Sequence, residues 1–363
     1  MNAPGMVLAV YAPGISKKDG GTMIRVIVVA ALGFVLGAPA FAAEPDRLEQ
    51  QAQIEQLAAG IASELARICP AAQPGDQAAF DRCRQGLFRD SRLKSALSPV
   101  VMWGRVHKDP NASLKQSQMT QFAPDVLTGM YIPLFMFNGK HTVEYDEREK
   151  FFLVKLEVAF RNRLAPGEFP YPFWHSSDKW NTYQGANTVL LRFDPKTAKV
   201  KVAQFTDRGA TAPIVRSDPI DPGKFDGLWM WTDAQGITQP QVTLFDGLFR
   251  RDNPYLQNLD SAYRTLALKM RDGQCDTCHV PNNPNEMKRL VLLQTPAHAA
   301  GEIKRLMKSV RQDRMPLDDT GIEQPLDPKL KNALLQSGEA FDKLVDAAKG
   351  WELNQSQSTL SKK

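Results

Sequence analysis

The chain of 363 residues lacks the motifs that identify many nucleotide-binding and hydrolytic enzymes. It has no Walker-type phosphate loop, no dinucleotide-binding glycine pattern and no nucleophile elbow. No internal repeat is visible. The net charge is only +5 for the full chain and +3 once residues 1–42 are set aside. Such a modest charge gives no reason to expect a nucleic-acid partner.

Cysteine is scarce, and its four copies fall into two separate pairs. Cys69 and Cys83 form one pair, and Cys275 and Cys278 belong to the pentapeptide CDTCH at positions 275–279. In a C-x-x-C-H motif the two cysteines attach haem c, and the adjacent histidine is the proximal ligand of the iron. The sequence therefore predicts one covalent haem c held by Cys275, Cys278 and His279. A di-haem peroxidase would need a second motif of this kind.

Two other uses of C-x-x-C agree less well with the surrounding sequence. A structural zinc site needs further nitrogen or sulfur ligands, and the other two cysteines are distant in sequence. A thioredoxin-like pair lies between a strand and a helix. Here a predicted helix (259–271) precedes the motif, and a polar, proline-rich stretch (280–285) follows it.

The N-terminal region has the layout of an export signal. Arg25 precedes an apolar run over residues 26–36, and Ala40-Phe41-Ala42 gives a small-x-small cleavage pattern. We therefore expect a signal peptide over residues 1–42, cleaved near Ala42, and a periplasmic protein. Met23 offers an alternative start. The apolar run is short for a membrane span, and an uncleaved N-terminal anchor is the alternative. Haem c is attached outside the cytoplasm in bacteria, so the two features support each other.

Met315, followed by Pro316, is the predicted distal ligand of the iron. A thioether sulfur raises the reduction potential of haem iron, and the proline stiffens the loop. An open distal site is the alternative to ligation. Three other residues compete with Met315. Met307 is interpreted as a core residue of a predicted helix, Met287 as a packing or surface residue, and His298 as a surface residue near a helix start.

Residues 256–351 resemble a class I cytochrome c domain. The resemblance is carried by a helix over 259–271, the C-x-x-C-H motif, a middle helix over 297–312, the Met315-Pro316 pair and a last helix over 327–351. It covers about a quarter of the chain. The resemblance implies that a proline carbonyl orients the proximal imidazole, and Pro281, Pro284 and Pro296 are the candidates.

Residues 43–97 are expected to form a helical hairpin. Residues 52–68 and 77–88 have apolar residues at helical spacing. A loop that begins at Cys69-Pro70 separates the two helices. In an exported protein the two remaining cysteines most simply pair, so we expect a Cys69–Cys83 disulfide that staples the hairpin. Free or metal-binding thiols are the alternative.

The central residues predict a mixed α+β domain of unknown fold. Strands are expected over 152–160 and 241–245, a hairpin over 187–193 and 199–205, and a helix over 176–186. The aromatic stretch from Glu168 to His175 is interpreted either as a buried plug or as a ligand pocket. The clusters at 131–137 and 229–231 are interpreted as core.

Together these patterns predict a multidomain α+β protein. The expected parts are a signal peptide (1–42), a helical hairpin (43–97), a mixed α+β domain (98–255), an all-α haem domain (256–351) and a flexible tail (352–363). The predicted function is an exported carrier of single electrons rather than a catalyst. Its partner would be a redox protein. Basic residues including Lys304, Lys308 and Arg311 either form a positive surface that steers an acidic partner or are simply a solvated helix face. The alternative is a haem-containing oxidoreductase or gas sensor whose central domain binds a small molecule.

Overall fold

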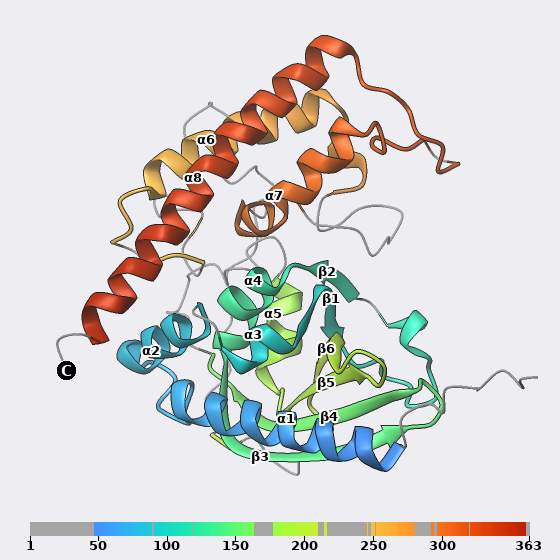
Figure 1. Ribbon diagram of the computed structural model, residues 1–363, viewed down its shortest axis with the longest axis vertical. Coiled ribbons are helices and arrows are strands. Elements are labelled where there is room, and N and C mark those ends of the chain that lie inside the picture. The colour runs from blue at the N-terminus through green and yellow to red at the C-terminus, as the bar shows by residue number, and fades with distance from the viewer. Residues whose placement is uncertain are drawn as a thin grey trace, which may run out of the picture. The chain divides into compact units, whose positions relative to one another are not determined.

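Helix α1 (Arg47–Ile68) packs along strand β3 (Phe135–Asp146) of the sheet in the computed structural model of the protein (Figure 1). The helix forms because apolar residues recur every three or four positions, which places Ile54, Ile61 and Leu65 on one buried face. Residues Pro45–Lys363 form one compact unit, and a single hydrophobic core extends from α1 to the C-terminal helix.

The structure describes only part of the chain. The described residues are 47–88, 91–117, 119–162, 177–209, 214–215, 245, 248–250, 252–279, 292–293, 296–318 and 320–360. The predicted signal peptide lies outside these ranges, as do the strand residues predicted at 241–244. Within them, no helix combines the length and the apolarity that a membrane crossing requires.

A disulfide closes the loop between α1 and helix α2 (Gln77–Phe88). The structure places Cys69 and Cys83 at bonding distance, which agrees with the predicted pairing, and both residues are fully buried. The loop also touches the sheet, because the amide of Phe137 donates a hydrogen bond of 2.9 Å to the carbonyl of Cys69. The hairpin is thus tied internally by the disulfide and to β3 by the backbone.

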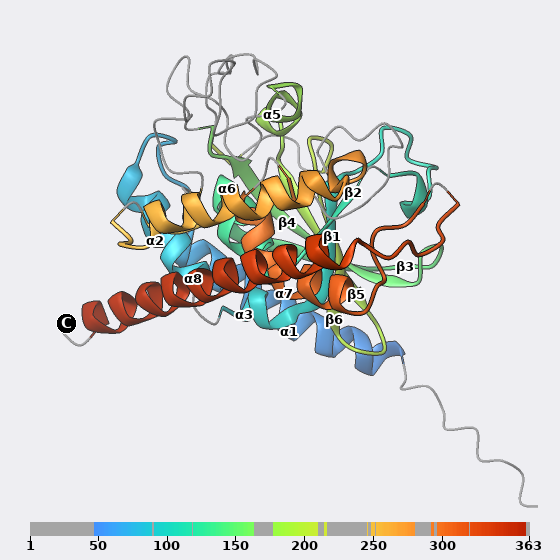
Figure 2. The same ribbon diagram turned by 90° about the horizontal axis from the view of Figure 1, so that it is seen from above.

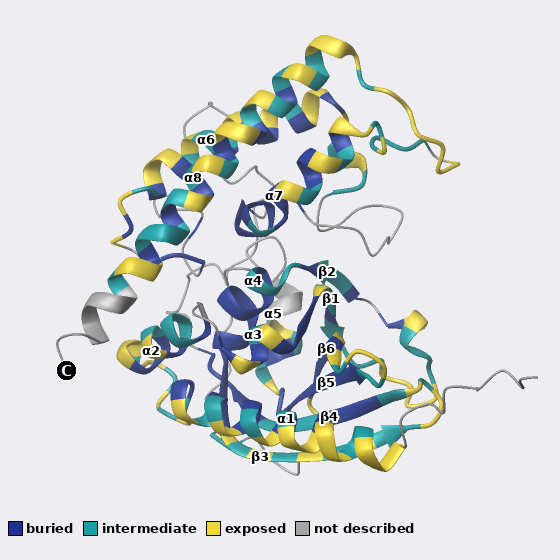
Figure 3. Cartoon of the chain, viewed as in Figure 1, coloured by how far each residue is buried: buried dark blue, intermediate teal, exposed yellow. Residues whose placement is uncertain are grey.

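The sheet has six strands in the order β2-β1-β6-β5-β4-β3. Their bounds are Leu97–Arg105 for β1, Met119–Phe122 for β2, Phe135–Asp146 for β3, Phe151–Phe160 for β4, Thr188–Asp194 for β5 and Lys199–Thr206 for β6. Only β1 and β6 pair in parallel, and every other neighbouring pair is antiparallel. Most residues of β4 and β5 are buried, as Figure 3 shows.

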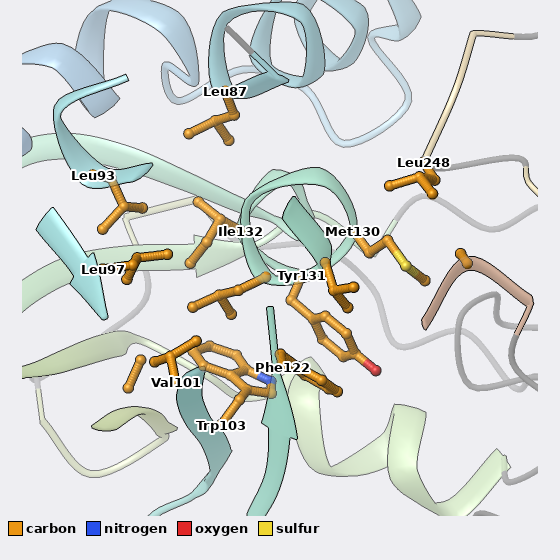
Figure 4. Close-up of a cluster of buried hydrophobic side chains, with 14 of the residues drawn as sticks. Leu87, Leu93, Leu97, Val101, Trp103, Phe122, Met130, Tyr131, Ile132 and Leu248 are labelled. Carbon is orange, nitrogen blue, oxygen red and sulfur yellow. The ribbon is translucent and has the colours of Figure 1, made fainter. Parts of the chain in front are cut away.

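Short helical segments lie before and between the strands along the chain, and aromatic side chains pack on the sheet. These segments are α3 (Arg92–Ala96), η1 (Leu114–Gln116), α4 (Pro124–Val126), η2 (Leu127–Tyr131), η3 (Ile132–Leu134) and α5 (Ser177–Gln184). Trp103 of β1 donates a hydrogen bond of 2.8 Å to the hydroxyl of Tyr183. Phe122 stacks on Tyr131, with ring centroids 4.6 Å apart, and Figure 4 shows both rings beside Trp103. The predicted core role of the 131–137 cluster is confirmed, because all seven of its residues are buried.

Three helices make up the C-terminal part of the chain. They are α6 (Leu256–Asp272), α7 (Pro296–Arg311) and α8 (Pro328–Leu360). Figure 2, like Figure 1, shows α6 and α8 running side by side, and α7 packs on α8 as well. Gly338 of α8 faces Met307, and a Cβ at this glycine would clash with the Met307 sulfur. The lack of a side chain at Gly338 is what allows α7 and α8 to approach closely.

Most predicted elements are found within a few residues of their expected bounds, and the structure contains the predicted mixture of helices and strands. The flexible tail predicted from Glu352 is wrong over its first nine residues, because α8 continues to Leu360. Glu352 is buried, and its carboxylate accepts hydrogen bonds from the Arg250 amide and the Asn253 side chain. These contacts anchor a segment whose polar composition resembles that of a disordered tail.

Asp125 joins three helices that are far apart in sequence. Its carboxylate pairs with Lys94 of α3 at 2.8 Å and with Lys349 of α8 at 2.6 Å. Burial opposes ionisation of this carboxyl group, but the two lysines outweigh that effect and lower its pKa to about 2. The ionised form of Asp125 therefore stabilises the packing of α8 against α4.

We expect Asp125→Asn to lower the free energy of unfolding by about 2 kcal/mol at neutral pH. A carboxyl group with a lowered pKa stabilises the folded state above its unfolded pKa, and this contribution disappears as pH falls toward 2. Urea unfolding at several pH values should therefore show a gap between variant and wild type that closes below about pH 4. A gap of equal size at neutral and acidic pH would show that Asp125 acts through shape rather than charge.

Candidate functional site

The C-x-x-C-H pentapeptide forms a tight turn directly after α6. Gly273 ends the helix, and its amide donates to the carbonyl of Lys269 at 3.2 Å. Gln274 has a φ of +56°, in the left-handed region, which redirects the chain. The turn η4 (Cys275–Thr277) follows, and the His279 amide donates to the Cys275 carbonyl at 2.9 Å. This geometry holds both cysteines and the histidine on one short segment.

The four predicted site residues line the same hollow. Cys275, Cys278, His279 and Met315 border an empty space of about 410 Å³, part of which is open to solvent. The other lining residues are Gln274 and Thr277 of the motif turn and five apolar residues from α7, the loop after it and α8: Val310, Pro316, Leu317, Leu326 and Leu334. Met315 thus reaches the motif even though it follows His279 by more than thirty residues.

Neither cysteine of the motif takes part in a disulfide, and both are partly buried. Burial and the neighbouring Asp276 carboxylate raise the pKa of the Cys275 thiol to about 12. A thioredoxin-like nucleophile has the opposite property, because its pKa is lowered to favour the thiolate. The environment of Cys275 therefore does not resemble that of a reactive dithiol.

The end of α7 fixes the start of the loop that carries Met315. Asp313 has a φ of +53°, its amide donates to the Val310 carbonyl at 3.2 Å, and the Arg314 amide donates to the Ser309 carbonyl at 3.0 Å. These are the two hydrogen bonds of a Schellman motif. Lys331 of α8 then bonds both carboxylate oxygens of Asp313 at 2.7 Å. The backbone two residues before Met315 is therefore held by both α7 and α8.

A second tether lies just beyond Met315, in a turn organised by Asp318. The Asp318 carboxylate accepts hydrogen bonds from the hydroxyl of Thr320 at 2.7 Å and the amide of Ile322 at 2.9 Å. These hydrogen bonds lower the pKa of Asp318 to about 2. The backbone amide of Gln324 closes the turn by donating a hydrogen bond of 2.9 Å to the Pro316 carbonyl. The loop that carries Met315 is thus constrained on both sides.

The residues that hold this loop were not predicted from the sequence. Asp318 had a usable signal, because an Asp two positions before Thr320-Gly321 is typical of a side-chain-stabilised turn, and Gly321 has a positive φ. Lys331 and Asp313 had none, since only the packing of α7 on α8 brings them together.

His298 was predicted to be a surface residue, and this is wrong. The side chain is 4% exposed, its Nε2 lies 2.9 Å from the hydroxyl of Tyr131, and its ring lies 4.8 Å from that of Phe122. It belongs to the contact between α7 and the sheet, and it does not line the hollow. Met307 is a core residue, as predicted.

Other predicted candidates fall outside the described residues. These are Met287, Pro281, Pro284, the aromatic stretch up to His175 and the cluster at 229–231. Pro296 is described, and it is buried at the first position of α7.

The basic residues of α7 face acidic residues of α8. Lys304 pairs with Asp342 at 3.2 Å and with Asp346 at 2.9 Å. Arg311 pairs with Glu339 at 2.8 Å. These two cations therefore connect the helices although they are exposed, and Lys308 and Arg314 are exposed as well.

Glu302 lies one turn after His298 on α7 and is 2% exposed. Burial raises the pKa of this carboxyl group, and the pairing with Arg305 at 2.9 Å offsets that effect only in part. A carboxyl group with a raised pKa stabilises the folded state below its unfolded pKa, and this contribution is lost as pH rises through the folded value.

We therefore expect Glu302→Gln to raise the free energy of unfolding at pH 7, with the gain shrinking toward pH 4. Urea unfolding at both pH values measures the difference. Glu339→Gln is the matched control, because it removes an exposed ion pair of the kind that contributes little to stability. A Glu302→Gln variant that is less stable than wild type at pH 7 would mean that pairing outweighs burial.

No family model, curated protein or solved structure matches the chain. Within the described ranges, no cluster of three or more His, Cys, Asp and Glu side chains could hold a metal ion. An iron held by one imidazole and one thioether does not need such a cluster. The donor set suits a covalent haem c, because it offers two thiols for attachment, an adjacent imidazole, a thioether and an apolar wall.

Proposed function

We propose that the protein is an exported c-type cytochrome with a single haem, which carries single electrons. The observation that carries this proposal is the hollow lined by Cys275, Cys278, His279 and Met315 together. The order of α6, the motif, α7, Met315 and α8 is also the order of a class I cytochrome c domain. The proposed domain occupies residues 256–351, after the hairpin (43–97) and the mixed α+β part (98–255).

Each site residue has a distinct proposed role. Cys275 and Cys278 anchor the porphyrin through thioether bonds, His279 is the proximal ligand and Met315 is the distal ligand. When bound, haem supplies an iron that gains and loses one electron. Leu317, Leu326 and Leu334 give the hollow an apolar wall, and an apolar surrounding of this kind tunes the potential of a metal centre.

The setting of the proposed carrier follows from residues 1–42, which we propose are a signal peptide that directs it to the periplasm. Its partner is proposed to be a redox protein. An acidic partner would meet Lys308 and Arg314, which are exposed cations near the Met315 loop. Lys304 and Arg311 contribute less to such a surface, because acidic residues of α8 already pair with them.

The visible spectrum of the protein, expressed in a periplasm, tests this proposal. We expect sharp reduced bands, the weak red band of an iron–methionine bond when oxidised, and no response to carbon monoxide. Met315→Ala should abolish the red band and open the iron to carbon monoxide. Met307→Leu is the matched control, since Met307 is a buried core residue outside the hollow, and it should leave both properties unchanged.

Each contrary outcome has a definite meaning. A high-spin wild-type spectrum that shifts with carbon monoxide would replace the carrier with an oxidoreductase or gas sensor. A red band that survives in Met315→Ala would assign the distal ligand to another residue. A protein without covalent haem would end the proposal altogether.

A further inference from the structure

The backbone of the proximal histidine is held by a second contact besides the C-x-x-C-H turn. The carbonyl of His279 accepts two hydrogen bonds, from the amides of Leu292 and Leu293, each 3.0 Å long. Both leucines are buried, and they lie more than ten residues further along the chain. The chain therefore returns to His279 after the motif and fixes it from the carbonyl side.

Tyr263 of α6 extends this contact into the core. Its hydroxyl donates a hydrogen bond of 2.7 Å to the carbonyl of Leu292. The side chain is fully buried, and its ring packs 5.8 Å from Phe341 of α8 and 6.3 Å from Phe245, measured between ring centroids. The donor is thus placed by a rigid apolar setting that joins α6 to α8.

The hydrogen bonds form a short relay from α6 to the proximal histidine. Tyr263 binds the carbonyl of Leu292, and the amide of Leu292 binds the carbonyl of His279. Helix α6 therefore reaches His279 twice, once along the chain through Gly273 and η4 and once across space through Tyr263. The turn and the Tyr263 relay together restrict the backbone of His279 more than the turn alone would.

We propose that Tyr263 is a positioning residue for His279. Metal ligands are commonly oriented by hydrogen bonds from outside the coordination sphere, and the loss of such partners weakens the site. Here the restraint acts on the ligand's main chain rather than on its imidazole ring. The role in haem ligation depends on the proposed function, whereas the restraint on the segment 292–293 does not.

The test compares Tyr263→Phe with Tyr183→Phe in the full chain. Tyr183 is also a buried tyrosine with a hydrogen-bonded hydroxyl, but its partner is Trp103 in the sheet. Each variant keeps its ring and loses one hydroxyl, so losses of global stability should be similar. Amide hydrogen exchange at Leu292 and Leu293 is the first measurement, and it needs no haem. We expect exchange about tenfold faster in Tyr263→Phe than in Tyr183→Phe.

The second measurement uses the haem-loaded protein. The pH at which acid removes the low-spin spectrum should rise in Tyr263→Phe and stay at the wild-type value in Tyr183→Phe. Equal exchange at Leu292 and Leu293 in both variants would overturn the proposal. Unprotected amides at these positions in the wild type would overturn it even if Tyr263→Phe did not fold. A wild type without haem, with the exchange difference present, would instead overturn the proposed function and keep the restraint.

Discussion

Replacing Cys275 and Cys278 together with alanine is expected to reduce the proposed covalent haem from one per chain to none. The two thiols lie on one turn at the edge of the same hollow, and they are the only cysteines outside the disulfide. No other side chain of the protein can form the thioether bonds. The loss should therefore be complete rather than partial.

The measurement is the haem that stays with the polypeptide after denaturation and acidic extraction, together with the intact mass. Cys69→Ala with Cys83→Ala is the matched control, because it also removes two cysteines but takes them from the hairpin. The folded fraction of this control should carry haem as the wild type does. Covalent haem in the variant that lacks Cys275 and Cys278 would refute the assigned attachment.

The closeness of Cys275, Cys278 and His279 was predictable, because the pentapeptide places all three within five positions. Two thiols and an imidazole within five positions must lie close together in almost any backbone conformation. The position of Met315 at the same hollow depends on the packing of α7 and α8, which returns the loop after α7 to the motif. Amphipathic spacing gave those helices within a few residues.

His298 shows where such reasoning stops. Its position near Pro296 at a helix start predicted exposure, and nothing nearby in sequence opposes that reading. Its burial comes from Tyr131, which is 167 residues away, and from Phe122. A contact of this range depends on how α7 meets the sheet, which no local pattern encodes.

The sheet shows the same limit. Strand β4 and the β5–β6 hairpin were predicted from alternating apolar residues, but β1, β2 and β3 were not. Strand β1 contains Pro99 and Gly104, residues that weaken a strand pattern. It is held by parallel pairing with β6, about a hundred residues away. Distant parallel strands are not joined by a tight turn, so no turn residues in the sequence indicate this pairing.

Replacing both Cys69 and Cys83 with alanine is expected to lower the free energy of unfolding by about 3 kcal/mol. The bond closes a loop with a sequence separation of 14, and restricting a loop of this length in the unfolded chain accounts for most of the effect. Both cysteines are fully buried. Each alanine removes only one sulfur atom, so the space left is small, but no new contact replaces the bond between the two residues.

Urea unfolding of the double-alanine variant measures this loss, and wild type treated with a reductant is its counterpart. The two should have matching midpoints, and the reductant should leave the variant unchanged. The loss of structure should be confined to the hairpin. The Cys69 carbonyl still accepts a hydrogen bond from the Phe137 amide, which keeps α1 against β3. Amide exchange should therefore rise in α2 and the loop before it while β4 and β5 remain protected. Equal loss of protection in the hairpin and the central strands would mean that the disulfide supports the whole fold rather than the hairpin.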